Sequence, residues 1–170
     1  AREVIESANY GYSRNKILLP GAGVGGGCLV KDPYLLIASL KGKLELELVK
    51  SSRRINDSMI DETIKLIKNG FKKVGREIEN SKILILGFAF KGVPDTDDIR
   101  FSPTLPIVDF LKEQKSMLFG FDPVVPSKTI KELGVKGVPD FETGEYDCVI
   151  IMNNNPKFRN IDFKKIEDKT

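Results

Sequence analysis

The second half of the chain contains four short segments rich in apolar residues. They occupy residues 82–87, 117–121, 135–138 and 147–152. Runs of this kind are typical of strands buried on both faces, as in a parallel sheet. Helical patterns over 103–114 and 127–133 separate the first three runs. This order of elements predicts an α/β fold in which a parallel sheet is flanked by helices.

The first half of the chain has the apolar spacing of helices. Residues 1–10 have the pattern of the end of a helix, and a second helix is expected over about 32–41. From about residue 44 to 73, apolar residues recur at spacings of three and four. They are Ile60, Ile64, Ile67, Phe71 and Val74. This stripe predicts a helix of about 30 residues, roughly 45 Å long. Its length favours a contact with a second copy of the chain, although packing within its own domain also explains the stripe.

A charged turn at residues 75–80 marks the point where the composition changes. We therefore expect a helical domain over residues 1–78, which also carries the glycine loop described next, and an α/β domain over residues 79–170. A chain of 170 residues is long enough to bury a proper core.

The most informative segment is a glycine-rich loop that ends in a cysteine. It reads Pro20-Gly21-Ala22-Gly23-Val24-Gly25-Gly26-Gly27-Cys28, and Asp32-Pro33 follows. Glycine lets a ligand approach the main chain closely, so the thiol of Cys28 is placed where a ligand can reach it. Asp32 and Pro33 are the residue types expected at a helix N-cap and at the first helical position. We therefore expect Cys28 just before a helix N-terminus, whose positive end favours a thiolate. The alternative is a flexible loop with a structural cysteine.

Gly21, Gly23 and Gly26 also fit the dinucleotide pattern G-x-G-x-x-G. That pattern binds a pyrophosphate when a strand precedes it, a helix starts inside it and a second parallel strand follows. Here the preceding apolar run is short and ends in Pro20, and the glycines oppose a helix start before about Asp32. Another helix follows in place of a strand. We therefore expect no pyrophosphate site in this loop.

The composition excludes several classes of function. The net charge is only +3 and the basic residues are scattered among acidic ones, which argues against a nucleic-acid partner. The chain has no histidine, so catalytic triads and histidine-ligated metal sites are excluded, and we expect no metal. The apolar runs are too short to span a membrane, and none resembles a signal peptide. Two cysteines without a pairing pattern favour a reducing compartment, so we expect a cytoplasmic protein.

The long connection after the first predicted strand is a second candidate site. Ligands of open α/β sheets bind beyond the carboxyl ends of the strands, and this connection exceeds the usual length. It contains Phe90, Lys91 and Arg100. An aromatic ring and two cations suit a base, a phosphate and a further anion, so we expect a nucleoside diphosphate here rather than NAD. The alternative is that Arg100 pairs with Asp97 or Asp98 and only shapes the loop.

Three stretches together resemble the UDP-glucose/GDP-mannose dehydrogenase family. They are the cysteine loop, the run Arg53-Arg54-Ile55-Asn56-Asp57-Ser58-Met59 of the long helix, and the segment from Leu86 to Pro103. Members of this family are NAD-dependent oxidoreductases that convert the C6 alcohol of a nucleotide sugar to a carboxylate. The resemblance implies an N-terminal Rossmann domain for NAD, a central helical domain and a Rossmann-like C-terminal domain for the UDP-sugar. It implies that this chain corresponds to the last two, lacks the NAD domain, is inactive alone and forms a homodimer through the long helix.

The resemblance also implies roles for individual residues. Cys28 would attack the aldehyde left by a first hydride transfer, and a second transfer would give a thioester that water cleaves. Asp32 would assist proton transfer or activate that water. Substrate contacts are implied for Arg14, which would reach the substrate of the partner subunit, and for Gly25, Gly26, Gly27, Phe90, Lys91 and Arg100.

The residues around the thiol also bear on the sugar. Gly27 stands where members acting on N-acetylhexosamines often have histidine, yet Asp32-Pro33-Tyr34 resembles that same branch. We expect UDP-N-acetylmannosamine or a similar 2-acetamido sugar, in polysaccharide biosynthesis. Phe101 replaces a glutamate common in the family, and Cys148 is expected to be an inert buried thiol. Two other functions stay open: a non-catalytic UDP-sugar-binding or dimerisation module, and an unrelated thiol enzyme.

Overall fold

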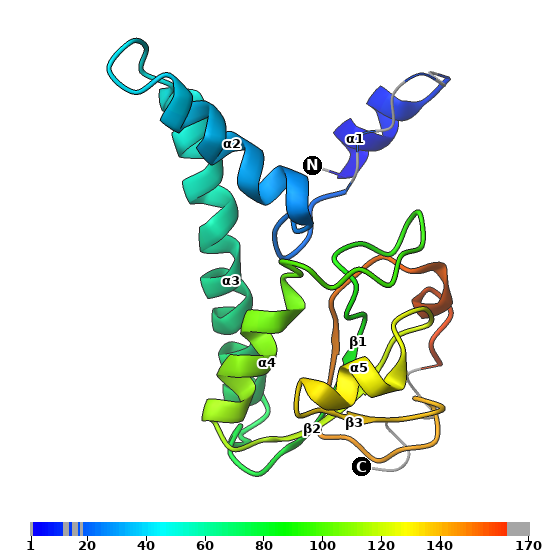
Figure 1. Ribbon diagram of the computed structural model, residues 1–170. Helices are drawn as coiled ribbons and strands as arrows, with labels where there is room; N and C mark the ends of the chain where they lie inside the picture. Colours follow the sequence, from blue (N-terminus) through cyan, green and yellow to red (C-terminus); the bar gives the residue numbers. More distant parts are fainter. Residues whose placement is uncertain (1, 12–13, 15–16, 18, 163–170) are drawn as a thin grey trace.

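A computed structural model describes residues 2–11, 14, 17 and 19–162 of the chain (Figure 1). Its helices are α1 (Arg2–Asn9), α2 (Gly27–Ser39), α3 (Glu47–Lys73), α4 (Thr104–Glu113), α5 (Ser127–Glu132) and the short 3₁₀ helix η1 (Pro156–Phe158). Its strands are β1 (Lys82–Leu86), β2 (Met117–Phe121), β3 (Lys136–Gly137) and β4 (Cys148–Ile151). Every strand and helix expected from the sequence is present, with ends that differ by a few residues for most of them.

Within the described residues the four strands form one parallel sheet in the order β3-β2-β1-β4. β1 lies in the middle, where Leu84 is opposite Phe119 of β2 and Val149 of β4. The side chains of β1 from Ile83 to Leu86 are all fully buried. A central strand covered on both faces explains its continuous apolar sequence and confirms the predicted α/β fold.

The two faces of the sheet are covered by different parts of the chain. Ile83 and Ile85 point to the face on which α3, α4 and α5 pack, and Leu84 and Leu86 point to the other face. That second face is covered by aromatic and aliphatic residues of the C-terminal part, namely Phe141, Tyr146, Phe158 and Ile161. The helices and the C-terminal part thus cover the two faces of the sheet, and the connections that follow the strands lie at its carboxyl edge.

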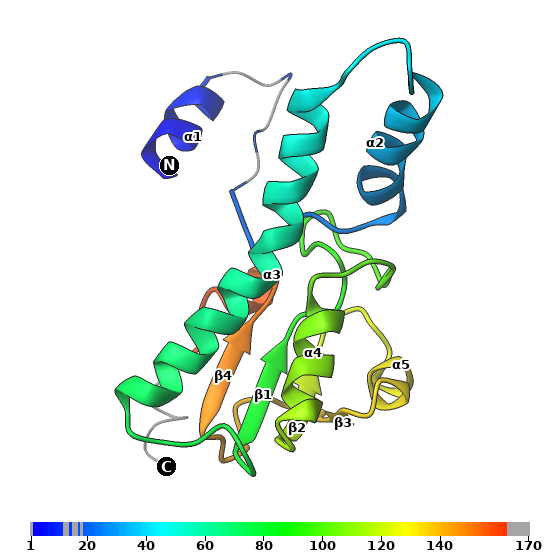
Figure 2. The same cartoon turned by 90° about the vertical axis from the view of Figure 1, so that its left-hand side faces the viewer.

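Helix α3 contacts both the sheet and helix α2. Its second half packs on the sheet, where Ile67 and Phe71 are buried, and its first half extends past the sheet and carries α2 (Figures 1 and 2). The predicted long helix is confirmed, but it begins at Glu47 instead of about residue 44. Val74 was expected in the buried stripe and is 68% exposed, because α3 ends at Lys73 and Val74 already leaves the helical path.

The expected start of α2 is wrong. The helix begins at Gly27, immediately after Gly26 with φ of 87°, and continues through Pro33 to Ser39. Cys28 is thus the second helical residue instead of preceding the helix, and Asp32 does not cap it. A proline in a helix leaves the carbonyl four residues earlier without its partner. That carbonyl belongs to Leu29, and the Arg53 guanidinium of α3 donates a hydrogen bond to it at 3.2 Å. A side chain from another helix therefore makes the longer helix possible.

Candidate functional site

The glycine loop and the connection after β1 lie against each other, although some 70 residues separate them in the sequence. The Gly26 N–H donates to the carbonyl of Arg100 at 3.1 Å. A Cβ placed on Gly26 would lie 2.9 Å from the ring of Phe90, and one on Gly25 would lie 2.4 Å from the carbonyl oxygen of Phe101. The absence of side chains at these positions lets the two backbones meet. The two candidate sites of the sequence are thus halves of one region.

We predict that Gly25→Ala disrupts this contact and lowers the free energy of unfolding by about 1–3 kcal/mol. The reason is that the new methyl group meets backbone, which cannot rotate away. Gly27→Ala is the matched control, because a Cβ at Gly27 has open space around it. Urea unfolding of both variants checks the prediction, and equal stabilities would show that the loops do not pack as described.

Cys28 lies at this junction with its side chain exposed. Asp32 follows one helical turn later on the same face of α2, since residues four apart on a helix are neighbours. Its carboxylate accepts a hydrogen bond from Lys31 Nζ at 2.7 Å and is also exposed. A reachable thiol with a carboxylate one turn away is an arrangement suited to nucleophilic attack and proton transfer.

Arg100 is paired within its own loop. Its Nη2 donates to Asp98 Oδ2 at 2.7 Å, its Nε lies 3.0 Å from Oδ1, and its backbone N–H also donates to Oδ1. This pair raises the pKa of Arg100, with a smaller contribution from Cys28, and the guanidinium lowers the pKa of Asp98 to about 2. Arg100 therefore shapes the loop through Asp98, one of the two partners considered from the sequence. Its charge also lies within electrostatic reach of the thiol.

Phe90 and Lys91 form the other side of the region. Lys91 Nζ lies 5.2 Å from the centre of the Phe90 ring, and the Phe90 N–H donates to the carbonyl of Asp98 at 3.0 Å. Phe90 and Lys91 are half-buried, so the loop holds an aromatic face and an ammonium group in fixed relation. Such a pair suits a planar base and a phosphate.

Asp122, directly after β2, fixes the start of this loop, and it is not among the residues predicted from the sequence. The buried carboxylate accepts hydrogen bonds from the N–H groups of Phe88 and Ala89 at 2.6 and 3.1 Å. It also accepts from Val124 and Val125 at 2.9 and 3.0 Å. The available signal was an aspartate directly after a buried strand, at the edge where ligands bind. Here the aspartate binds the protein's own backbone and aligns the β1 and β2 loops.

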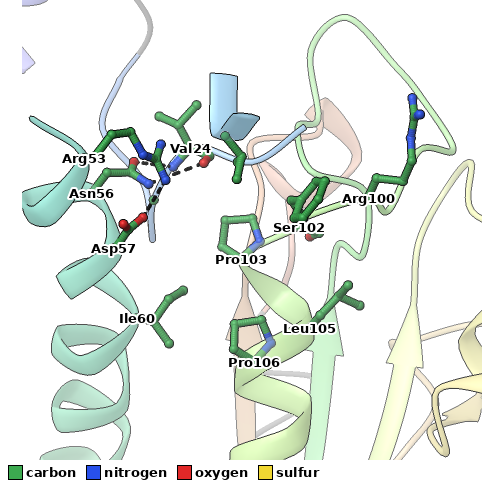
Figure 3. Close-up of a pocket in the computed structure, with 13 residues that line it drawn as sticks. Val24, Arg53, Asn56, Asp57, Ile60, Arg100, Ser102, Pro103, Leu105 and Pro106 are labelled. Atoms are coloured by element: carbon green, nitrogen blue, oxygen red, sulfur yellow. Dashed lines mark hydrogen bonds and ion pairs between the residues drawn. The ribbon is translucent and has the colours of Figure 1, made fainter. Parts of the chain in front are cut away.

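A cavity of about 630 Å³ lies beside this region, between the first half of α3, the glycine loop and the start of α4 (Figure 3). Its lining includes Val24, Ile60, Leu105 and Pro106, so it is largely apolar. Arg100 is part of its rim but extends away from it in Figure 3. Cys28, Asp32, Phe90 and Lys91 do not line it. The cavity is therefore adjacent to the thiol region without containing it.

The glycine loop is tied to α3 at the edge of this cavity. Asn56 Oδ1 accepts from the Val24 N–H at 2.8 Å, and its Nδ2 lies 3.5 Å from the Val24 carbonyl (Figure 3). An amide side chain that bridges both backbone groups of one residue fixes the path of the loop. Asn56 stands in the long-helix run that carries the family resemblance, and its contact with the loop was not anticipated.

Arg14 and Cys148 complete the set of residues considered from the sequence. Arg14 is an exposed turn residue ahead of the glycine loop, and its proposed reach to a partner's substrate stays a prediction. Cys148 is half-buried at the start of β4, and burial raises the pKa of its thiol to about 11.

We predict that iodoacetamide at pH 8 modifies Cys28 at least tenfold faster than Cys148. A thiol with a pKa of about 11 is roughly one part in a thousand thiolate at pH 8. The pKa of Cys148 is higher in the folded chain than in the unfolded chain. The free energy of unfolding therefore falls as the pH rises from about 9 to 11. Peptide mass spectrometry of the labelled chain measures the ratio, and equal labelling would contradict it.

Two general findings constrain the site. In the described ranges, none of the helices has the length and apolar character needed to cross a membrane. Within the same ranges, histidine, cysteine, aspartate and glutamate side chains form no group of three that would hold a metal ion.

Known proteins match this chain along nearly all of its length. Residues 84–170 match the UDP-glucose/GDP-mannose dehydrogenase family, UDP binding domain, and residues 1–58 match the central domain of the same family. The UDP-N-acetyl-D-mannosamine dehydrogenase of Pyrococcus horikoshii is 34% identical over 96% of this chain and 36% of its own length. The UDP-glucose 6-dehydrogenase of Rhizobium meliloti is 29% identical over 90% of this chain and 35% of its own. The chain thus spans about a third of the length of these curated relatives.

Solved structures show the same relation. The structure of the UDP-D-ManNAc dehydrogenase from Pyrococcus horikoshii superposes with a TM-score of 0.78 at 32% identity, covering 99% of this chain and 37% of that one. A UDP-glucose dehydrogenase from Pyrobaculum islandicum gives a TM-score of 0.78 at 26% identity, covering 95% and 37%. These neighbours confirm the Rossmann-like character of the sheet region.

Proposed function

Because the chain belongs to the UDP-glucose/GDP-mannose dehydrogenase family, we propose that it is the substrate-binding part of an NAD-dependent nucleotide-sugar 6-dehydrogenase. Its homologues are UDP-sugar dehydrogenases. The observation that carries the proposal is the contact between the glycine loop and the β1 loop. It brings an exposed thiol next to the aromatic and cationic residues suited to a nucleotide.

Cys28 supplies the nucleophile in this proposal. Its sulfur bonds to the C6 carbonyl carbon of the aldehyde form of the sugar, the C=O double bond becomes single, and the thiol proton ends on the oxygen. NAD, when bound, would supply the two-electron oxidant that accepts a hydride from that carbon, and loss of the hydroxyl proton then leaves the thioester. Water attacks the thioester, the C–S bond breaks and a proton returns to sulfur. Asp32 accepts the proton of the attacking water. Both cysteines are free, which supports a reducing, cytoplasmic setting for this chemistry.

The described residues do not fit an NAD site. Gly21, Gly23 and Gly26 match the dinucleotide pattern, but residues 19–26 are not in a strand, and the element that follows α2 is the helix α3. The Gly26 N–H is occupied by the carbonyl of Arg100. We propose that NAD is bound mainly by residues outside these 170, and that the 170 residues alone bind a UDP-sugar without oxidising it.

The nucleotide sugar lies across the two loops in this proposal. Phe90 and Lys91 hold the uridine diphosphate, while Gly25, Gly26 and Gly27 line the sugar near the thiol. Arg100 adds positive charge, and Arg14 reaches the substrate of a partner subunit. A 2-acetamido sugar such as that of UDP-N-acetylmannosamine is favoured, because relatives with that name reach 34% and 32% identity over most of the chain.

A homodimer through α3 is the expected assembly. The outer surface of α2 and the first half of α3 carries exposed apolar side chains, among them Leu35, Leu36, Leu48 and Ile55. Exposed apolar side chains gathered on neighbouring elements are typical of an interface. Residues 1–78 would then form the helical, dimer-forming domain and residues 79–170 the UDP-sugar-binding domain.

We predict that Lys91→Ala weakens UDP binding to this chain by about 1–3 kcal/mol, the cost of losing a charged hydrogen bond. Lys131→Ala on α5 is the control, since it changes the same charge outside the region. Isothermal titration with UDP measures both. An affinity unchanged by Lys91→Ala would remove this residue from the site.

Protection of the thiol separates the proposal from its alternatives. A UDP-N-acetylhexosamine bound across both loops should slow alkylation of Cys28, and NAD alone should not. A thiol enzyme of another class would show no protection by the nucleotide sugar. The second candidate, a UDP-sugar-binding or dimerisation module without catalysis, is favoured by the lack of an NAD site in the described residues. It predicts protection of Cys28 but no dependence of acid formation on that thiol.

A further inference from the structure

The backbone hydrogen bonds of helix α2 are interrupted near its N-terminal end, which carries Cys28. Pro33 is the seventh residue of the helix. A proline there lacks the N–H that would bind the carbonyl of Leu29, and such an interruption costs about 3 kcal/mol or more in an ordinary helix. Leu29 is the residue directly after Cys28. The gap in the hydrogen-bond ladder therefore falls on the turn that carries the thiol.

Arg53 of α3 fills that gap. Its Nη1 donates to the Leu29 carbonyl at 3.2 Å, and its Nη2 donates to Asp57 Oδ1 at 2.5 Å. The Asp57 carboxylate also accepts from the Tyr34 hydroxyl of α2 at 2.9 Å. The Arg53 guanidinium lies 5.7 Å from the centre of the Tyr34 ring. One guanidinium thus joins α2 to α3 on both sides of Pro33.

Arg53 is the one buried residue in α2 and the first half of α3, both of which the structure describes. Arg53 is 8% exposed, and α3 has just two other buried residues, Ile67 and Phe71, which face the sheet. Helix α2, all of which is described, has no buried residue. Burying a guanidinium is costly unless its donors are paired. The Arg53 Nε is buried without a hydrogen-bond partner, which costs free energy. The hydrogen bonds to Asp57 and to the Leu29 carbonyl offset this cost.

We infer that Arg53 is a positioning residue for Cys28: it supplies the hydrogen bond that Pro33 removes from α2 and so holds the turn that carries the thiol. The inference rests on the proposed function only in that Cys28 is taken to be the catalytic nucleophile. The Cys28 carbonyl is the helical acceptor of the Asp32 N–H, so opening of this turn displaces the thiol and the carboxylate together. Asn56, next to Asp57 on α3, ties down the loop on the other side of the thiol.

The test is a double-mutant cycle between Arg53→Met and Pro33→Ala, in a Cys148→Ala background so that one thiol reports. Alanine at residue 33 returns an N–H to the Leu29 carbonyl, which can accept two hydrogen bonds. In Arg53→Met, hydrogen exchange of the Lys31 and Asp32 amides should accelerate about ten- to hundredfold, as for loss of a charged hydrogen bond. The rate of alkylation of Cys28 at pH 7 should change about two- to fivefold, because opening of the turn moves the thiol from its place at the junction of the two loops.

Adding Pro33→Ala should restore both quantities to within about twofold of the parent. A general packing role for Arg53 predicts instead the same losses with either residue at position 33, and that result overturns the inference. Arg53→Lys, which keeps the charge but reaches a single acceptor, provides the second variant if Arg53→Met does not fold. The dependence on residue 33 should persist there. These readouts need no turnover, so nucleotide-sugar protection of Cys28 in the parent chain tests the proposed function separately.

Discussion

In the proposed NAD-dependent dehydrogenase, replacing Cys28 by serine is expected to reduce acid formation by at least about 10³-fold. Serine at this position is a weaker nucleophile, and water would hydrolyse its ester more slowly than a thioester. The thiol is exposed at the junction of two loops, so the loss would arise from chemistry and not from packing. The measurement is the steady-state rate of uronic acid production.

Cys148→Ala is the matched control for this experiment. That thiol begins β4, away from the two loops, and burial raises its pKa to about 11. We expect Cys148→Ala to keep the rate within about twofold. A Cys28→Ser enzyme that turns over like its parent would exclude the thioester and leave the chain as a binding module.

Replacing Asp122 by alanine is expected to lower the free energy of unfolding by roughly 3–5 kcal/mol. The carboxylate accepts hydrogen bonds from four backbone N–H groups, and it is 9% exposed. Removing one acceptor therefore leaves several buried donors unpaired at once, each costing about 1–3 kcal/mol before the loops relax. The loops after β1 and β2 would lose their alignment, and nucleotide binding would weaken with stability.

Asp109→Ala on the surface of α4 is the control for this second prediction. Its carboxylate is 74% exposed and lies 3.9 Å from Lys112 Nζ, so its removal should change stability by less than about 0.5 kcal/mol. Urea unfolding followed by circular dichroism compares the two variants. Similar midpoints for Asp122→Ala and Asp109→Ala would show that the buried aspartate does not organise the loops.

The strands could be predicted from the sequence because a strand buried on both faces has a continuous run of apolar residues. Ile83 to Leu86 form a continuous apolar run, and all four side chains are fully buried. The long helix was predicted for a similar reason, since Ile67 and Phe71 repeat at helical spacing and face the core. Local pattern and tertiary packing agree in these elements.

The start of α2 could not be predicted from local pattern. Its sequence places glycines and a proline where both oppose a helix, and the compensating group is Arg53, twenty residues beyond Pro33. The role of Asp122 was missed for the same reason, because two of its four partners, the N–H groups of Phe88 and Ala89, belong to the loop after another strand. Both errors concern side chains that satisfy backbone groups of distant segments, which periodicity does not record.

The contact between the two loops could be predicted only in part. Phe90 and Cys28 were each selected from their own surroundings, and family resemblance placed both in one site. The contact itself depends on Gly25 and Gly26, where a side chain would collide with Phe101 and Phe90. The glycines were expected to make room for a ligand. In the structure they also make room for the neighbouring loop.

We propose that these 170 residues bind a UDP-sugar and do not bind NAD. Isothermal titration of the chain with UDP-N-acetylmannosamine, UDP and NAD tests it most directly, with circular dichroism to confirm that the chain is folded. We expect one site per chain for both uridine ligands, with binding weakened by Lys91→Ala, and no heat of binding with NAD. Binding of NAD in place of the uridine ligands, or no uridine binding by the folded chain, would contradict it.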